Sequence, residues 1–321
     1  MSIPSKRILV LGATGVVGKV LTNSLLNAGP AFDHIGIFTS AESAASKSAL
    51  LDEFRSRGAE VIVGDLFSEE DVLNAYKHYD TVVSAVGRFA IDKQIDLIAT
   101  AERSPSIVRF IPSEFGTDVA YNATSALEKP HQKKLKVRAF LESSAVQRLK
   151  YTYIVTGPIA DLYAGDMSSE PRMGSFSVAK KEATLLGDGK GKINLTTMGD
   201  CGRLLVAVLR NPQYCDNKAV FVNSFTATPE EILAEMERQT ETRWKIDYTS
   251  LEDLKTLEAQ AWKEEKPLAS IYTLRRIWTQ GLTLYDKMDN EAIGVAKTDT
   301  LEMVVQEAVK SPVAAFQSGK L

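Results

Sequence analysis

The sequence predicts an α/β protein: a Rossmann-type doubly wound parallel sheet, followed by a smaller C-terminal α/β domain. Three observations lead to this prediction. Short apolar runs alternate with helical segments through the first half, a glycine-rich loop follows the first run, and the regular alternation stops after Gly157. Strands and helices in such alternation form crossover units, which give parallel strands covered by helices on both faces.

Strands and helices account for nearly all of the first half. The run Arg7–Leu11 is short, apolar and stopped by Gly12, as in a buried parallel strand. Ser68 is expected to cap the helix that follows it, and Gly58 to end the helix before it. The expected strands are 7–11, 34–38, 60–63, 81–84, 107–111 and 151–155, and the expected helices are 16–27, 49–57, 69–76, 91–102 and 132–145.

The loop between the first strand and the first helix carries three glycines, Gly12, Gly15 and Gly18. The first permits a tight turn, the second lets the backbone approach a pyrophosphate, and the third lets the helix pack closely on the strand. Backbone N–H groups at the start of a helix face bound phosphates. The loop therefore predicts a dinucleotide site with these contact residues: Gly12, Thr14, Gly15, Val16, Val17 and Gly18.

The end of the second strand indicates which dinucleotide is bound. An acidic residue there would hold the ribose 2′-hydroxyl and repel a 2′-phosphate. This strand ends in Thr39 and Ser40, the first acid is Glu42, and Lys47 lies nearby. Hydroxyls with a cation tolerate a 2′-phosphate, so the expected cofactor is NADPH rather than NADH. The alternative for Lys47 is a solvated side chain at a helix start.

The pattern is less regular after residue 157. Gly, Ser, Pro and Met over 164–174 predict a loop, the glycines in 186–192 predict a turn, and Thr228-Pro229 marks a helix start. Further expected elements are a strand at 220–222 and helices at 251–263, 268–280 and 300–309. We expect a cofactor-binding domain, 1–157, and a mainly substrate-binding domain, 158–321, with segments of about 193–225 as candidates to return to the first sheet.

The composition is that of an ordinary globular protein, with 44% hydrophobic and 25% charged residues in 321 and a net charge of −3. The sequence contains no Lys/Arg-rich block of the kind that indicates a nucleic-acid partner. Neither a signal region nor an apolar stretch long enough for a membrane span is recognisable, so a cytoplasmic monomer or homodimer is expected. The two cysteines have no metal-ligand spacing, and no metal site is expected.

Several further segments resemble one known family. They are Gly64-Asp65-Leu66, Val83 to Gly87, Arg109 to Gly116 (RFIPSEFG), and a basic helix with Lys133, Lys134, Lys136 and Arg138. This series resembles the isoflavone reductase-like branch of the NmrA-type atypical short-chain dehydrogenases. That branch includes isoflavone, phenylcoumaran benzylic ether and pinoresinol–lariciresinol reductases and fungal oxidoreductases. The resemblance implies NADPH-dependent reduction of a small aromatic or phenolic substrate, in secondary metabolism.

The resemblance also implies roles for individual residues. Asp65 is placed near the adenine, and a lysine four residues before Arg138, Lys134, corresponds to the catalytic lysine. Such a lysine can hold the nicotinamide ribose, and it can exchange a proton with a substrate oxygen if burial or cationic neighbours lower its pKa. The remaining residues implied to line the cofactor groove are Ser84, Ala85, Val86, Gly87, Gln94, Ser113, Glu114 and Phe115.

Alternatives to Lys134 stay open at this point. Lys133 takes its place if the register is off by one, and a solvated helix cation is the structural alternative. His131 lies three residues before Lys134 and is a candidate second proton relay. The Tyr-x-x-x-Lys pair of common short-chain dehydrogenases occurs only as Tyr214 with Lys218, which is expected in a surface loop away from the site.

The chain departs from the plant members of this family at two places. Thr39 stands where those enzymes carry an arginine, and Gly157, Pro158 and Ile159 stand where they carry Asn-Cys-Phe beside the nicotinamide and the substrate. We expect this triplet to flank the cofactor here too, with a different substrate preference. The second hypothesis is a regulator that senses NADP, without turnover, and acts through a protein partner.

Overall fold

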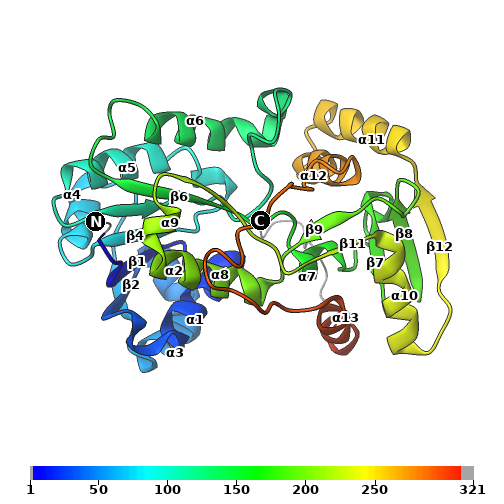
Figure 1. Cartoon of the computed structure of the whole chain (residues 1–321), viewed down its shortest axis with the longest axis horizontal. Coiled ribbons are helices and arrows are strands. Elements are labelled where there is room, and N and C mark those ends of the chain that lie inside the picture. Colours follow the sequence, from blue (N-terminus) through cyan, green and yellow to red (C-terminus); the bar gives the residue numbers. More distant parts are fainter. Residues whose placement is uncertain (1–2, 312–321) are drawn as a thin grey trace.

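A computed structural model describes residues 3–311 of the chain, so residues 1, 2 and 312–321 of the two expected domains lie outside the described residues (Figure 1). The centre is a seven-stranded sheet in the order β10-β6-β5-β4-β1-β2-β3, and every neighbouring pair in it is parallel. Its strands are β1 (Arg7–Leu11), β2 (His34–Thr39), β3 (Glu60–Val63), β4 (Thr81–Ser84), β5 (Arg109–Ile111), β6 (Lys150–Val155) and β10 (Lys218–Phe221).

Both faces of this sheet are covered, which explains the unbroken apolar run of β1. Ile8 and Val10 belong to one hydrophobic core and Leu9 and Leu11 to the other, because successive side chains of a strand point to opposite faces. The first core includes side chains of α1 (Val16–Asn27), α3 (Ser48–Ser56) and α8 (Met198–Arg210), and the second those of α4 (Glu69–Tyr76), α5 (Gln94–Arg103) and α6 (Gln132–Leu141). The predicted doubly wound Rossmann-type fold is confirmed.

Local end signals were read correctly, whereas the boundaries of several elements were wrong. Ser68 caps α4, and Gly58 follows α3 with a φ of +95°. The helix expected at 132–145 ends at Leu141, because Ser143 bonds through its hydroxyl to the Phe140 carbonyl (2.7 Å) and so competes with the next helical turn. Likewise α5 begins at Gln94 rather than residue 91, and β5 at Arg109 rather than residue 107.

Two small sheets lie beyond the main one, on the right in Figure 1. One joins β9 (Ile193–Leu195) and β11 (Phe225–Ala227) in antiparallel fashion, and the other has the order β12-β8-β7, with β7 (Ser175–Ser177), β8 (Glu182–Leu186) and β12 (Lys245–Thr249). Of the segments expected to return to the first sheet, β10 does so beside β6, whereas β9 and β11 pair with each other.

Of the remaining helices, α2 follows β2 of the main sheet, and most of the others lie around the small sheets. The α helices are α2 (Ala41–Ser46), α7 (Ala160–Tyr163), α9 (Pro212–Cys215), α10 (Pro229–Thr240), α11 (Leu251–Lys263), α12 (Ala269–Thr279) and α13 (Leu301–Lys310). Single 3-10 turns occur at Gly29–Ala31, Arg88–Ala90, Ser125–Leu127, Lys129–His131 and Pro171–Met173. Thr228 caps α10 and forms the reciprocal capping box with Glu231, as its sequence indicates.

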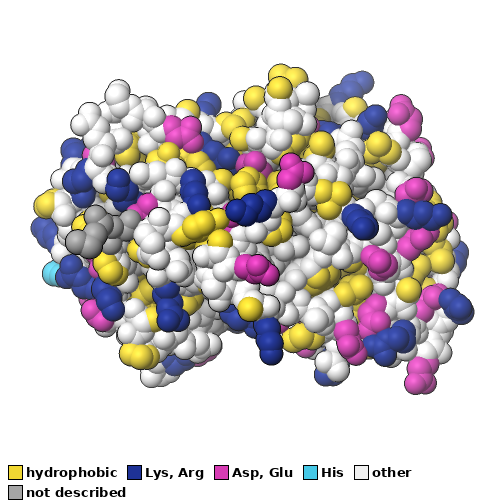
Figure 2. All heavy atoms as spheres, viewed as in Figure 1, with side chains coloured by type: hydrophobic (Ala, Val, Ile, Leu, Met, Phe, Trp, Pro, Cys, Tyr) yellow, Lys and Arg dark blue, Asp and Glu magenta, His cyan; other side chains and the backbone are white. Residues whose placement is uncertain are grey.

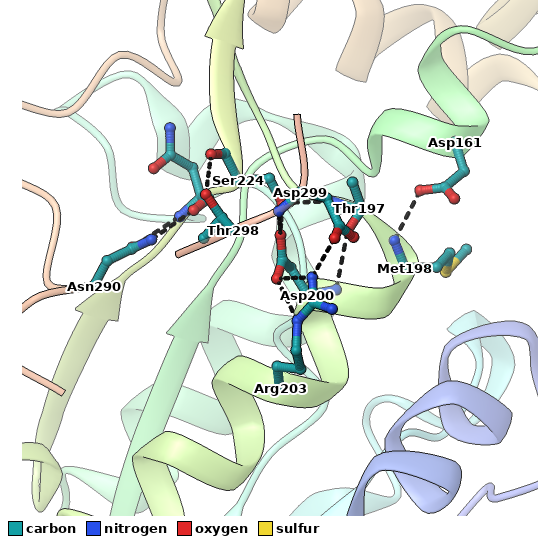
Figure 3. Close-up of polar contacts among 10 residues, drawn as sticks. Asp161, Thr197, Met198, Asp200, Arg203, Ser224, Asn290, Thr298 and Asp299 are labelled. Atoms are coloured by element: carbon teal, nitrogen blue, oxygen red, sulfur yellow. Dashed lines mark hydrogen bonds and ion pairs between the residues drawn. The ribbon is translucent and has the colours of Figure 1, made fainter. Parts of the chain in front are cut away.

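A polar cluster ties the segment before α13 to the start of α8 (Figure 3). Thr197 caps α8, and the fully buried Asp200 accepts from the Ser224 hydroxyl, the Asp299 N–H (2.8 Å) and Arg203. Arg203 also reaches the Asp299 carboxylate (2.5 Å). The cluster therefore holds the C-terminal segment against a helix that the sequence analysis missed.

The outer surface has a mixed character. Lysine and arginine side chains are interspersed with acidic ones and with small apolar areas over the face shown in Figure 2. Within residues 3–311, no helix is long and apolar enough to cross a membrane. Within the same range, no group of three or more His, Cys, Asp or Glu side chains is arranged to hold a metal ion.

Candidate active site

The three glycines of the first loop make close backbone contacts that other residues would obstruct. Gly12 has a φ of +77°, and a Cβ atom there would lie 2.6 Å from the Ala85 carbonyl oxygen. A Cβ on Gly18 would lie 2.0 Å from the Gly12 carbonyl oxygen. The loop is therefore wedged between the ends of β1 and β4, and α1 starts directly from it.

The N-terminus of α1 is open. Gly15 is its N-cap residue, and among the described residues no side chain caps it and no acid lies in its first turn. Gly15 and Val16 are exposed, and Thr14 and Val17 are half-buried. The free N–H groups and the positive end of the helix dipole make this end a place where an anion is stabilised.

The neighbouring strand β4 ends at the same edge of the sheet. Ser84 is paired with Leu11 in the sheet register and is fully buried, and its hydroxyl has no hydrogen-bond partner within residues 3–311. Ala85 donates its N–H to the Leu11 carbonyl (2.8 Å), and Gly87 is exposed. Since β1 and β4 flank the point where the strand order reverses, this edge is where open α/β sheets bind ligands.

The residues predicted to recognise a 2′-phosphate lie at the end of β2 and between the two short helices that follow it. Thr39 is buried at the end of β2, and the Ser40 hydroxyl accepts from the Ser43 N–H (3.1 Å) and so caps α2, a helix that the sequence analysis missed. Lys47 is exposed between α2 and α3. Asp65 is exposed as well, and its carboxylate accepts from the Phe67 N–H (2.8 Å).

Hydrogen bonds join the end of β5 to the loop after β4. The buried Gln94 side chain accepts from the Ser113 N–H (2.8 Å), and the Ser113 hydroxyl donates to the Val86 carbonyl (3.0 Å). Gln94 donates to the Ile91 carbonyl (3.1 Å), which fixes its amide. The structure therefore gathers Val86, Gln94 and Ser113 in one place, as the resemblance implies.

A buried ion-pair network follows β5. Arg138 on α6 forms two bonds to the Glu114 carboxylate (2.9 and 3.0 Å) and one to Asp118 (2.8 Å), and its guanidinium stacks on the Tyr153 ring, 4.4 Å from its centre. Glu114 is 2% exposed. The sequence analysis did not find this network, because no local spacing relates an arginine on a helix to acids in a preceding loop.

Lys134 lies one helical turn before Arg138 and reaches the same loop. Its Nζ donates to the backbone carbonyl of Glu114, and a Cβ on Gly116 would be 4.0 Å from that Nζ. Burial lowers the pKa of Lys134, and the charge of Arg138 lowers it further. Lys133 instead points to Asp92 (3.2 Å) on the exposed side of the helix, so the geometry favours Lys134 over Lys133.

The triplet after β6 borders this loop. Gly157 donates its N–H to the Gly116 carbonyl (3.0 Å) and has a φ of +64°, and a Cβ there would lie 2.9 Å from the Asn194 carbonyl oxygen. Pro158 accepts from the Thr196 N–H (3.1 Å), and Ile159 is half-buried. Phe115 is buried beside the Glu114 carbonyl that Lys134 holds.

The comparison with protein families decides the assignment. The model of the NmrA-like family matches residues 4–284, most of the chain. The chain belongs to the NmrA-like family. The resemblance found in the sequence is therefore confirmed.

Individual relatives of this NmrA-like chain agree with that assignment. An oxidoreductase of Aspergillus flavus, aprR, is 31% identical over 78% of the chain and 79% of its own length. Phenylcoumaran benzylic ether reductase PT1 of Pinus taeda is 29% identical over 83% of the chain and 80% of its own length. Both are named as oxidoreductases or reductases, in line with the expectation of an enzyme.

Solved structures have the same fold. The complex of leucoanthocyanidin reductase from Vitis vinifera with NADPH superposes with a TM-score of 0.80 at 22% identity, over 95% of the chain and all of that protein. Isoflavone reductase superposes with a TM-score of 0.77 at 22% identity, over 94% of the chain and 99% of that protein. These likenesses extend the NmrA-like assignment to the arrangement of both parts of the molecule.

The residues of the NmrA-like chain fit a dinucleotide. The glycines of the β1–α1 loop pack so closely on neighbouring backbone that the helix start comes right up to the sheet edge, the N-terminus of α1 lacks a capping side chain within residues 3–311, and the buried Ser84 hydroxyl has no partner there. A pyrophosphate supplies the acceptor atoms that the helix end requires.

The Tyr-x-x-x-Lys pair lies elsewhere. The Tyr214 hydroxyl, on α9, donates to Asp289 (2.5 Å). Lys218 begins the central-sheet strand β10 rather than lying in a surface loop as expected.

Proposed function

We propose that this chain is an NADPH-dependent reductase that transfers a hydride to a small aromatic or phenolic metabolite. The observation that carries the proposal is Lys134: a half-buried ammonium group is fixed by the Glu114 carbonyl beside a sheet edge that is shaped for a dinucleotide. Membership of the NmrA-like family and the reductases among its relatives support it. The NADPH and NADP⁺ complexes of structures with this fold support the choice of cofactor.

Residues at the carboxyl ends of β1, β2 and β4 would hold the cofactor. The α1 N-terminus with Gly12, Gly15 and Gly18 would receive the pyrophosphate, and Ser84 would find a hydrogen-bond partner in the bound dinucleotide. Thr39 borders the place for the 2′-phosphate. We propose that residues 1–157 with β10 form this cofactor-binding part, and that most of 158–321 faces the substrate.

Bound NADPH supplies the hydride, and the protein supplies position and electrostatics. Lys134 would donate a hydrogen bond, and then a proton, to the substrate oxygen that becomes negative as the hydride arrives. Its lowered pKa, caused mainly by burial, makes proton release easier near neutral pH. Glu114, Arg138 and Asp118 would keep the carbonyl that aims this lysine in place.

A calorimetric titration with NADPH and NADH tests the proposal, followed by oxidation of NADPH in the presence of a panel of aromatic aldehydes, enones and quinones. We expect tight, NADPH-selective binding and turnover of at least one compound. Absence of binding by either nucleotide would contradict the cofactor site. Tight binding without turnover of any compound would instead favour a regulator that senses NADP and acts through a protein partner.

A further inference from the structure

The three-stranded sheet of the C-terminal half has two unlike edges. In its order, β12-β8-β7, the edge strand β7 is short and all three of its residues are buried. The other edge strand, β12, has five residues, of which only Thr249 is buried. Strand β12 lies at the right-hand end of the molecule in Figure 1, and no other strand of residues 3–311 pairs with its outer side. Within the described part of the chain, β12 is therefore an open edge.

The hydrogen bonds between β12 and β8 show which backbone groups of β12 point outward. Lys245 donates its N–H to the carbonyl just before β8 (2.9 Å), and the Thr249 carbonyl accepts from the N–H just after β8 (2.9 Å). The backbone groups of successive residues in a strand point to opposite sides, so every second residue of an edge strand has no neighbouring strand to bond. Ile246 and Tyr248 are the residues that present their N–H and C=O groups to the outside.

The side chains of β12 alternate between charged and apolar. In the register with β8, Lys245 and Asp247 stand on one face of the sheet, and Ile246 and Tyr248 stand on the other. These two apolar side chains are 42% and 53% exposed. Unpaired backbone groups beside exposed apolar side chains are a template for a further strand, whereas charged side chains on an edge oppose such pairing. The arrangement of the two charges therefore decides which strand can pair here.

The order of the charges makes β12 complementary to a second copy of itself. When a two-fold axis relates two antiparallel strands, the pairing is the same in both directions, and outward-facing residues must oppose one another. A register centred on Asp247 brings two carboxylates face to face. A register centred on Ile246 instead places each Lys245 opposite the partner's Asp247. The two Ile246 residues then exchange a pair of backbone hydrogen bonds, and their side chains meet on the apolar face.

We infer that β12 pairs in antiparallel fashion with β12 of a second copy of this chain, centred on Ile246, so that the two three-stranded sheets join into one across a homodimer. Opposite charges directly across from each other stabilise paired strands, and like charges destabilise them. A single short edge gives an interface at the small, transient end of the known range, so the association is reversible, with a dissociation constant in the micromolar range. The dimer leaves the carboxyl edge of the central sheet free, and the inference is independent of the proposed function.

Sedimentation equilibrium of the full chain tests this pairing, over concentrations from about 5 to 500 µM. Two charge reversals are compared with the wild type, Lys245→Asp and Asp247→Lys, each alone and as an equimolar mixture. Each variant alone places like charges opposite one another, whereas the mixture restores opposite charges on both sides of the axis. Lys263→Asp, at the exposed end of α11, is the matched control.

We expect the wild type and Lys263→Asp to associate with similar constants, and each β12 variant alone to associate at least about 10-fold more weakly. The mixture should associate about as strongly as the wild type, as a heterodimer. Melting temperatures are measured alongside, because Lys245→Asp also places an acid beside Glu182 within the same sheet. Association that neither charge reversal weakens, or that the mixture does not restore, would overturn the inference.

A backbone variant tests the same pairing without a change of charge. Ile246→Pro removes an N–H that points away from β8, so the bonds within the chain remain while the two at the centre of the dimer are lost. We expect this variant to stay monomeric with a melting temperature close to that of the wild type, and its continued dimerisation would contradict the inference. The inference also fails if the wild type is monomeric at about 500 µM. A chain that dimerises only when it ends at Ser311 would assign the edge to residues 312–321 instead.

Discussion

Arg138 and Arg203 each bridge two carboxylates, in very different surroundings. Arg138 joins Glu114 to Asp118 beside the candidate active site, and Arg203 joins Asp200 to Asp299 at the start of α8. The side chain of Arg138 is 8% exposed and that of Arg203 is 51% exposed. The same arrangement of charges is therefore expected to contribute differently to the free energy of unfolding in the two places.

The difference lies in what each carboxylate retains when the arginine is removed. Glu114 and Asp118 are nearly inaccessible and share Arg138 as their ion-pair partner, and without it Asp118 keeps the bond from the Ala120 N–H (3.1 Å). Asp200 is also buried, but it keeps its bonds from the Ser224 hydroxyl and the Asp299 N–H. Buried ion pairs are costly to break on one side, whereas half-exposed pairs contribute little. Of these two networks, the one at the candidate active site is thus expected to cost more stability when its arginine is removed.

The largest effect is expected for Arg138→Met. This change leaves two buried carboxylates without a counter-charge, and we expect a loss of about 3–5 kcal/mol in the free energy of unfolding, measured by urea denaturation. The loop that aims Lys134 would lose its anchor, so NADPH oxidation should fall with it. A loss below about 1 kcal/mol would mean that the comparison between the two arginines is mistaken.

A much smaller effect is expected for Arg203→Met, the matched change at the exposed network. Its free energy of unfolding should differ from that of the wild type by less than about 1 kcal/mol in the same urea experiment, since the guanidinium is half in water. NADPH binding should be unchanged, because the bonds of Arg203 go to Asp200 and Asp299 rather than to the glycine loop. Equal losses in the free energy of unfolding for Arg203→Met and Arg138→Met would contradict the expected difference between the two networks.

The smallest effect is expected at Asp161, which accepts from the Met198 N–H (2.8 Å) near the Arg203 network. Burial raises its pKa, and the charges of Asp299 and Glu307 add to the rise. The folded state thus holds this proton more tightly than the unfolded state. Asp161 therefore lowers stability progressively as pH rises from its ordinary pKa of 3.8 through the raised value, and the deficit persists above it.

Asp161→Asn should remove the dependence of stability on pH that this carboxylate causes. Relative to the wild type, the variant should be more stable at pH 7, by less than about 1 kcal/mol, and the difference should vanish near pH 3, where both side chains are neutral. Thermal melting of both proteins across this range is the measurement. A variant that is less stable than the wild type at pH 7 would show that the charged carboxylate is favoured there.

Local sequence signals made the strands and helices of the first half predictable. Some strands of the second half lack such signals and were not predicted. The apolar run of β1, the glycine loop and the Ser68 cap each lie within a few neighbouring residues. By contrast, β9 and β11 have three residues each and pair across about thirty residues of chain, so neither shows a period. Strand β12 alternates Ile246 and Tyr248 with polar residues over only five positions, and both apolar side chains are exposed, so the alternation marks no buried face.

The same distinction applies to the candidate site. Lys134 and Glu114 were recognised because they stand in segments that resemble a family, and their roles at the cofactor stay predictions. The bridge from Arg138 to Asp118 depends on contacts between the loop after β5 and the helix α6. Contacts of this kind follow from the packing of distant segments, and no residue spacing encodes them.

The central claim is that Lys134 performs the proton step of a reductase. Its most direct test is single-turnover oxidation of bound NADPH by 4-hydroxycinnamaldehyde in the wild type, Lys134→Ala and Lys136→Ala, the last an exposed lysine on the same helix. We predict that all three proteins bind NADPH with similar affinity and that only Lys134→Ala is slower, by about 100-fold or more. A Lys134→Ala protein that oxidises NADPH as fast as the wild type would contradict the claim.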